Sequence, residues 1–511
     1  MILITQQKHL LLIASIILLL TQHVAAQNSN RLVKSGPMLG YVEHRAALVG
    51  LEVTADADLV EIEYWEAKKP NKRNRMPYVG ELGKKYNPIH FTLEDLEMNT
   101  DYEYAIYVNK ILQQCPAPVP YQLRTKELWE WRKPAPDFTF LTGSCLYIND
   151  SIYDRPGKGY GQTTKILQPM AAEKADFNLW MGDNIYFRDP DLTSPSGMAY
   201  RYSHDRAVGD LQPLLVARPN FALWDDHDFG PNDSDRSFRL KHTARDLFMK
   251  YWGNITYGEQ DEGVYSSFTW SDCDFFMMDD RSFRASDNMN EMVDGKPNKQ
   301  KTYWGRNQLN WLQNALLTSK APFKFVVNGG QFINNMDTKE AFYNFPAEYQ
   351  EFMQFLANNK VNGVVLLSGD RHFSEVLELQ QPNEGYKIYE ITNSSLTSTT
   401  YSNMKEPELS NPLVSAGSVI KDENNYGRFS VSGDRNERKL HYEVLNGAGK
   451  KVYELTLNEK DLRWKKSEKK DKAPKKDGAE PKKDGLETKK ENTEPKKDGD
   501  DKAPKPTEKK D

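Results

Sequence analysis

Four short apolar runs in this chain each end in a polar cluster that contains glycine or aspartate. The runs occupy residues 138–141, 177–180, 221–224 and 364–367. Continuous apolar runs of this length are typical of strands that are buried on both faces of a sheet. Because α/β proteins bind ligands at the carboxyl ends of such strands, we expect the four clusters to converge on one site.

The clusters carry side chains that bind metal ions. They read Gly143-Ser144-Cys145, Gly182-Asp183-Asn184-Ile185-Tyr186, Asp225-Asp226-His227-Asp228 and Gly369-Asp370-Arg371-His372. Each cluster alone is explained by an ordinary turn, but four at equivalent places favour a site. Carboxylates brought together repel unless cations neutralise them. Two metal ions roughly 4 Å apart polarise a phosphoryl oxygen and generate hydroxide at neutral pH, so the pattern predicts metal-assisted phosphoester hydrolysis.

Composition excludes several other classes of protein. A mean hydropathy of −0.75 rules out a multispanning membrane protein. A net charge of −5 gives no reason to expect nucleic acid as a partner, except as a substrate. The chain has no Gly-x-Ser-x-Gly elbow, no phosphate-binding Gly-x-x-x-x-Gly-Lys-Ser/Thr loop and no closely spaced cysteine pair. At 511 residues, two or more domains are expected.

Residues 37–127 are predicted to form an all-β sandwich. Strand-like segments at 46–53, 59–65, 89–93 and 102–108 are separated by polar turns. The segment 96–104 resembles the tyrosine corner of fibronectin type III domains, with methionine where proline is usual. An ordinary strand with two inward tyrosines is the alternative. This domain carries no evident chemistry.

The two ends of the chain are expected to lie outside the folded domains. Residues 1–26 are predicted to be a cleaved signal peptide, because Lys8 precedes an apolar run at 10–20 that is short for a membrane anchor. The Lys-, Glu-, Asp- and Pro-rich tail at 465–511 is predicted to be disordered. It is either a solvated tail or a tether to an acidic polymer of the cell envelope.

The four clusters, in their order, resemble the alkaline phosphatase D (PhoD-like) family of the calcineurin-like metallophosphoesterase superfamily. Asp280-Arg281, which follows the apolar run 275–278, is a further landmark of the resemblance. The resemblance implies an α/β fold over residues 137–464, with two β-sheets flanked by helices, after a fibronectin III-like sandwich and before the disordered tail.

The resemblance also implies a role for each site residue. Cys145, Tyr186 and His372 are expected to bind a first metal ion, with Tyr186 as a tyrosinate that favours Fe³⁺. Asp183 is expected to bridge two ions, as the family motif implies. Asp226 and Asp370 are expected to bind the second ion, and an oxygen-rich site suits Ca²⁺. Zn²⁺ and Mn²⁺ are compatible alternatives.

Substrate contacts are expected from several further residues. His227 is expected to contact phosphate and assist the leaving group, and Asn232 to contact metal or phosphate. Arg281 and Arg371 either clamp a phosphate with paired hydrogen bonds or pair with the carboxylates of the site.

The superfamily has one more histidine before the last motif. Residues 325–332 hold none, so Asn328 and Gln331 are candidate substitutes.

These observations predict a secreted or periplasmic, monomeric, metal-dependent phosphomonoesterase or phosphodiesterase. The insert at 186–206 is rich in Tyr, Arg and Asp and is expected to shape the substrate groove. Cys115 and Cys273 are expected to be free buried thiols, although a bridge between the domains is the alternative. The rival function is a non-catalytic protein of the cell envelope with a decayed phosphatase domain.

Overall fold

The computed structural model describes residues 31–114, 120–154, 156–157, 159–161, 163–336, 340–401 and 410–465. The described residues belong to one compact unit that ends at Lys465. The predicted signal peptide, Cys115 and the tail after Lys465 lie outside them. Among the described residues, no helix is both long enough and apolar enough to cross a membrane.

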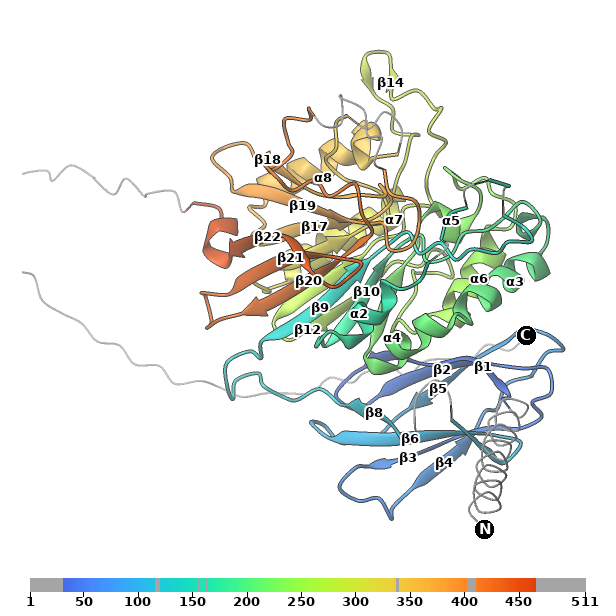
Figure 1. The fold of residues 1–511 in the computed structure, drawn as a ribbon. Helices are drawn as coiled ribbons and strands as arrows, with labels where there is room; N and C mark the ends of the chain where they lie inside the picture. Colours follow the sequence, from blue (N-terminus) through green and yellow to red (C-terminus); the bar gives the residue numbers. More distant parts are fainter. Residues whose placement is uncertain are drawn as a thin grey trace, which may run out of the picture. The chain divides into compact units, whose positions relative to one another are not determined.

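The N-terminal part is a β-sandwich of two antiparallel sheets (Figure 1). One sheet has the order β1-β2-β5, and the other has the order β4-β3-β6-β7 with β8 also paired to β6. The strands are β1 (Val33–Val42), β2 (Ala47–Val53), β3 (Val60–Glu66), β4 (Asn74–Pro77), β5 (Asn87–Leu93), β6 (Asp101–Val108), β7 (Ile111–Gln113) and β8 (Tyr121–Arg124). All four strand-like segments of the sequence are therefore strands.

The tyrosine corner forms at the start of β6. The backbone N–H of Glu97 donates a hydrogen bond of 2.8 Å to the Tyr102 hydroxyl. Tyr104, two residues later, is fully buried in the core between the two sheets. Met98, in place of proline, does not prevent the corner, because the hydrogen bond is made by a neighbouring backbone group.

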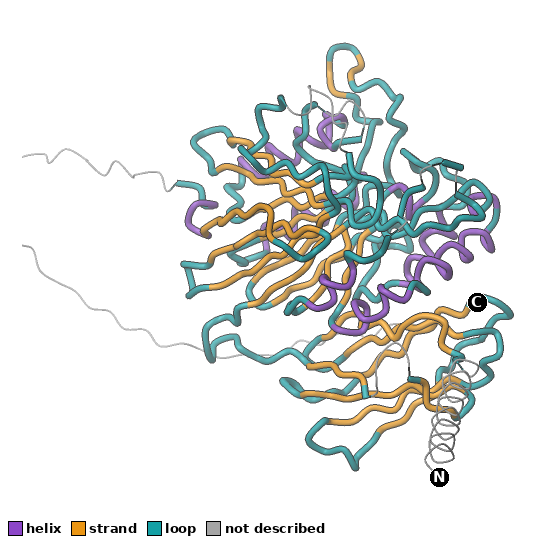
Figure 2. Tube along the Cα trace, viewed as in Figure 1, coloured by secondary structure: helices purple, strands orange, loops and turns teal. Residues whose placement is uncertain are grey.

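The C-terminal part contains two six-stranded sheets, with the helices outside them (Figure 2). Sheet I has the order β11-β10-β9-β20-β21-β22, and sheet II has the order β12-β13-β16-β17-β19-β18. Sheet I contains β9 (Phe138–Gly143), β10 (Phe177–Met181), β11 (Asn220–Leu223), β20 (Asn425–Ser432), β21 (Lys439–Asn446) and β22 (Lys451–Asn458). Sheet II contains β12 (Ser266–Trp270), β13 (Cys273–Met277), β16 (Lys324–Val327), β17 (Val364–Ser368), β18 (Ser374–Gln380) and β19 (Lys387–Asn393).

The parallel strands of each sheet give the fold its α/β character. Strands β9, β10 and β11 are mutually parallel in sheet I, and β13, β16, β17 and β19 are parallel in sheet II. The α-helices are α2 (Leu167–Ala172), α3 (Pro195–Arg206), α4 (Gln212–Ala217), α5 (Asp226–Phe229), α6 (Lys241–Tyr251), α7 (Gly305–Thr318) and α8 (Pro346–Asn358). In the described part of the chain, the remaining elements are a two-stranded sheet of β14 (Met292–Val293) and β15 (Lys296–Pro297) and four short 3₁₀ segments.

Phenylalanine rings fill the space between sheets I and II. Phe140 of β9 stacks on Phe429 of β20 at 4.7 Å between ring centroids and meets Phe275 of β13 edge-on at 5.3 Å. Phe275 in turn stacks on Phe325 of β16 at 4.6 Å. Burial of each ring contributes about 1.5–3 kcal/mol, so this core holds the two sheets face to face. It confirms the two-sheet sandwich expected from the sequence.

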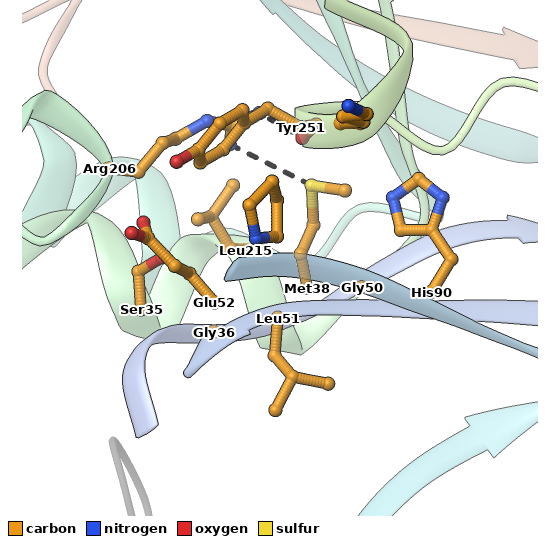
Figure 3. Close-up of a pocket in the computed structure, with 12 residues that line it drawn as sticks. Ser35, Gly36, Met38, Gly50, Leu51, Glu52, His90, Arg206, Leu215 and Tyr251 are labelled. Carbon is orange, nitrogen blue, oxygen red and sulfur yellow. Dashed lines mark hydrogen bonds between the residues drawn. The ribbon is translucent and has the colours of Figure 1, made fainter. Parts of the chain in front are cut away.

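The N-terminal sandwich contacts the C-terminal part of this unit through β1. The backbone N–H of Tyr41 donates to the Gly253 carbonyl at 2.9 Å, and the Asn220 amide donates to the Leu39 carbonyl at 3.0 Å. Figure 3 shows a small cavity at this contact, lined by Met38, His90 and Arg206 among others. Its volume of about 20 Å³ is room for a single water molecule.

Candidate active site

Four loops at the carboxyl ends of β9, β10, β11 and β17 carry the predicted metal ligands. Cys145, Asp183, Asp370 and His372 all have left-handed backbone conformations, with φ between 53° and 68°. Such conformations cost residues with side chains about 1–2 kcal/mol each. Strained residues of this kind persist where the surrounding structure fixes them, and they gather at functional sites.

Glycines let these loops approach one another closely. A Cβ on Gly369, at the end of β17, would lie 2.5 Å from the Met181 carbonyl oxygen and 2.5 Å from the Ser144 hydroxyl. A Cβ on Gly182, where φ is 85°, would lie 2.7 Å from the Asp225 Cβ. Sheet I and sheet II therefore meet at this edge with no room for a side chain, which brings the polar loops of both sheets together.

The first group of ligand atoms surrounds Asp183. Its Oδ2 lies 3.7 Å from Cys145 Sγ and 2.9 Å from the Tyr186 hydroxyl. The Tyr186 hydroxyl lies 3.4 Å from His372 Nε2. One ligand atom each from Cys145, Asp183 and His372 lies within 4.8 Å of the others, a spacing that allows all three to bind one ion.

A second and a third group continue from the first through shared carboxylates. Asp183, Asp226 and His227 form the second group, and Asp226, Asp233 and Glu340 form the third, again with ligand atoms within 4.8 Å. Asp183 thus belongs to two neighbouring groups, which is the geometry expected of a bridging ligand.

The Asp370 carboxylate belongs to none of the three groups. The backbone carbonyl oxygen of Asp370 lies 3.4 Å from Cys145 Sγ. Burial raises the pKa of both Asp183 and Glu340, and the negative charge of the Asp370 side chain adds to both shifts. Asp370 is therefore close to the site, and its role as a ligand of a second ion stays a prediction.

Burial shifts the pKa values of several titratable groups in the cluster. Burial, followed by the charges of Asp226 and Asp225, raises the pKa of Asp183 far above its usual value. Burial also raises the pKa values of the Cys145 thiol and the Tyr186 phenol, and lowers that of His372 to about 4. Burial thus opposes the thiolate and tyrosinate forms that metal binding requires.

Two observations indicate that these residues are suited to bind metal ions. Cys145, Tyr186 and His372 supply sulfur, phenol oxygen and imidazole nitrogen on one side of Asp183, and the other side supplies mainly carboxylate oxygen. The buried Asp225 Oδ2 has no hydrogen-bond partner among the described residues. Cations beside Asp183 would neutralise the repulsion and favour the deprotonated ligands.

Two neighbouring aspartates build the loop that holds Asp226. Asp225 and Asp228 form a capping box around the short helix α5. Asp228 also accepts two hydrogen bonds of 3.1 Å from the Asn184 backbone N–H, and burial raises its pKa to about 7. These carboxylates thereby tie the β10 and β11 loops together.

Arg281 is completely buried and surrounded by carboxylates. Its Nε donates to Asp225 Oδ1 at 2.7 Å, and a terminal nitrogen donates to Glu340 at 3.3 Å. Of the two roles expected from the sequence, this geometry favours pairing with carboxylates, and the phosphate clamp stays a prediction. Arg371 is half-buried, with its guanidinium 5.7 Å from the Phe373 ring centroid, and its clamp role is likewise a prediction.

The remaining expected residues take other positions. Asn232 is exposed and donates to Asp233 Oδ1 at 2.6 Å. The Asn328 amide donates to Asp280 and to the Tyr303 hydroxyl, and the Gln331 amide donates to Glu375. Both candidate substitutes for the missing histidine are thus engaged in buried networks outside the three ligand groups.

Asp233 and Glu340 were not expected from the sequence. Asp233 follows the aspartate-rich motif by five residues, so the local density of carboxylates was a usable signal. Glu340 lies in the loop between β16 and α8, with no motif around it, and only folding brings it beside Asp226.

Cys273 is a free, buried thiol, as expected from the sequence. The expectation for Cys115 falls outside the described residues.

Known proteins resemble this chain in sequence and in fold. Alkaline phosphatase D of Bacillus subtilis (strain 168) is 24% identical over 385 residues, which cover 65% of this chain and 63% of that protein. The match therefore spans less than two thirds of the length of that relative.

Two solved phosphatase structures share the fold. A structure of PhoD has a TM-score of 0.65 at 18% identity and covers 83% of this chain and 93% of that chain. Purple acid phosphatase PPD1 from yellow lupin (Lupinus luteus) seeds has a TM-score of 0.57 at 11% identity and covers 83% and 74%.

The model of the PhoD-like phosphatase family matches residues 156–443, more than half of the chain. The matched segment contains Asp183, Asp226 and His372, which lie in the first two ligand groups. This chain belongs to the PhoD-like phosphatase family.

Proposed function

We propose that the protein is a secreted phosphoester hydrolase that uses two metal ions, Fe³⁺ and Ca²⁺, held on either side of Asp183. The observation that carries the proposal is the membership of Asp183 in two adjacent ligand groups. Family membership and the resemblance to phosphatase structures support the hydrolase class. Secretion rests on the predicted signal peptide at 1–26.

Cys145, Tyr186 and His372, with Asp183, would hold the first ion, and Asp226 and Asp370, with Asp183, the second. When bound, such a pair of ions polarises the phosphoryl oxygen and lowers the pKa of water. The thiol and phenol must give up their protons to bind, so the first site selects a cation of high charge density. The carboxylate-rich second site suits Ca²⁺.

We expect His227 to act on the substrate. Its ring lies 4.2 Å from the Tyr186 ring, and its backbone N–H donates to Asp183 Oδ1 at 3.3 Å. Burial lowers the pKa of His227, and the neighbouring Asp226 charge opposes that shift. The imidazole would donate a hydrogen bond to the phosphate and deliver a proton to the departing alcohol.

The test compares Asp183→Asn with wild type and with Asp422→Asn, a control whose side chain is 73% exposed. Hydrolysis of p-nitrophenyl phosphate and bis(p-nitrophenyl) phosphate is measured beside iron and calcium content. We expect Asp183→Asn to lower activity by at least about a hundredfold and to reduce both metals, and Asp422→Asn to match wild type. The ratio of the two rates assigns the monoester or diester preference. Full activity of Asp183→Asn would overturn the proposal.

A further inference from the structure

A second pocket, with a volume of about 280 Å³, lies next to the chain segments that form the ligand groups. The N-terminal end of α6 contributes Lys241, His242 and Arg245 to its lining. The loop after α5 contributes Arg236, and the segment after Arg281 contributes Ser282 and Phe283.

Three cations of this pocket are bonded to neutral acceptors. Arg236 donates to the Thr302 hydroxyl at 2.8 Å, Lys241 to the Arg236 carbonyl at 2.9 Å and Arg245 to the Gly263 carbonyl at 2.9 Å. None of the three forms an ion pair with a carboxylate in the described part of the chain. None of the three positive charges is therefore neutralised by a direct ion pair within the residues that the structure describes.

Two of these cations lie at positions where their charge destabilises helix α6. Lys241 and Arg245 are four residues apart on α6, where like charges repel. Positive charge at the N-terminal end of a helix also opposes the helix dipole, and the first turn of α6 contains no acidic residue. An anion in the pocket would relieve both effects.

The pocket adjoins the candidate active site along two stretches of chain. Arg236 follows Asp233 by three residues, so their Cα atoms lie at most about 11 Å apart. The Arg236 backbone N–H donates to the Arg284 carbonyl at 3.0 Å, which ties it to the segment that begins with Arg281. Helices α5 and α6 pack against each other, side by side in Figure 1.

We infer that this pocket binds a second anionic group of the substrate, a phosphate carried on the part of the molecule away from the scissile phosphorus. The inference rests on the proposed function. Asp261 and Glu262 also line the pocket, so three cations and two carboxylates leave one net positive charge. That balance suits a single phosphate group and disfavours a dense polyanion. The exposed part of Phe283 offers an apolar contact to the linking portion of the substrate.

Non-hydrolysable probes test the inference without depending on the type of ester cleaved. Pentane-1,5-bisphosphonate and heptane-1,7-bisphosphonate are compared with pentylphosphonate and heptylphosphonate. Binding to the metal-loaded enzyme is measured by calorimetry, and inhibition of p-nitrophenyl phosphate hydrolysis is measured alongside. We expect at least one bisphosphonate to bind about tenfold more tightly than its monophosphonate, as for one added charge-assisted hydrogen bond.

The variants Arg236→Gln and Arg245→Gln keep a neutral donor for the Thr302 and Gly263 acceptors. Each should remove most of the bisphosphonate advantage while leaving monophosphonate binding and kcat for p-nitrophenyl phosphate unchanged. Lys387→Gln, which removes an exposed charge on β19 of sheet II, is the matched control and should keep the advantage.

The outcomes separate the inference from the proposed function. Equal binding of both probe types by an active enzyme overturns the inference and leaves the proposed function intact. Persistence of the advantage in both arginine variants also overturns it. Failure of the monophosphonates to bind or inhibit, in an enzyme with no hydrolytic activity, counts against the proposed function instead.

Discussion

Gly369→Ala tests the claim that close contact between the two sheets builds the site. The added Cβ would lie 2.5 Å from the Met181 carbonyl oxygen and 2.5 Å from Ser144 Oγ. Ordinary van der Waals contacts begin at 3.4 Å, so the shortfall is about 0.9 Å. Because the carbonyl belongs to the end of β10, side-chain rotation alone cannot remove the clash.

Relief of the clash must move the β17 loop away from the β10 loop. Asp370 directly follows Gly369, and Asp183 follows Met181 by two residues, so the predicted ligands separate with their backbones. Overpacking of this kind costs about 1–3 kcal/mol of stability. A displacement of about 1 Å in an active site costs on the order of a hundredfold in rate.

The assay pairs urea unfolding with kcat and KM for p-nitrophenyl phosphate. Gly209→Ala is the control, because a Cβ at Gly209 meets no atom within 4 Å. We expect Gly369→Ala to remain folded, with an unfolding free energy lower by about 1–3 kcal/mol and a much lower kcat, and Gly209→Ala to behave as wild type. A Gly369→Ala enzyme with normal stability and kcat would refute the reasoning.

Three further predictions concern groups around the site and in the N-terminal sandwich. Arg281→Gln should lower the free energy of unfolding in urea by about 3–5 kcal/mol, because Asp225 and Asp280 would lose their buried cationic partner. Arg281→Lys keeps the positive charge and should lower it less. Equal losses in the two variants would contradict the claim that the charge of Arg281 stabilises the fold. Tyr102→Phe should lower the unfolding free energy by about 1 kcal/mol without changing kcat, since it removes only the hydrogen bond from Glu97; an unchanged stability would count against the corner. Burial lowers the pKa of His90 from 6.5 to about 4, so the folded state binds the proton less well than the unfolded state. The free energy of unfolding should therefore fall by up to about 3 kcal/mol as the pH decreases from 6.5 towards 4. A His90→Gln variant lacks this group, and an unfolding free energy that declines as steeply as in wild type would contradict the prediction.

The strands that carry the site were predictable because their patterns are local. The runs at 138–141, 177–180, 221–224 and 364–367 fall within or overlap β9, β10, β11 and β17. Burial on both faces requires continuous apolar residues, and that requirement leaves a direct trace in the sequence. The ends of these strands then identify the residues that meet at the sheet edges.

Contacts between distant segments were not predictable in the same way. Glu340 joins the third ligand group from a loop without a motif, and the partners of Arg281 include Asp225 from the loop after β11 and Glu340 itself. Asn328 was a candidate ligand because of its position after β16, and in the folded chain its amide donates to Asp280. Such choices depend on tertiary packing, which residue type and spacing do not encode.

The most direct test of the central claim is an anomalous-diffraction map of crystals of protein purified without added metal. Our account predicts two metal peaks roughly 4 Å apart with Asp183 bonded to both, and with Cys145, Tyr186 and His372 around the peak that scatters at the iron edge. A single peak not bonded to Asp183, or well-ordered ligands with no peak beside them, would contradict it.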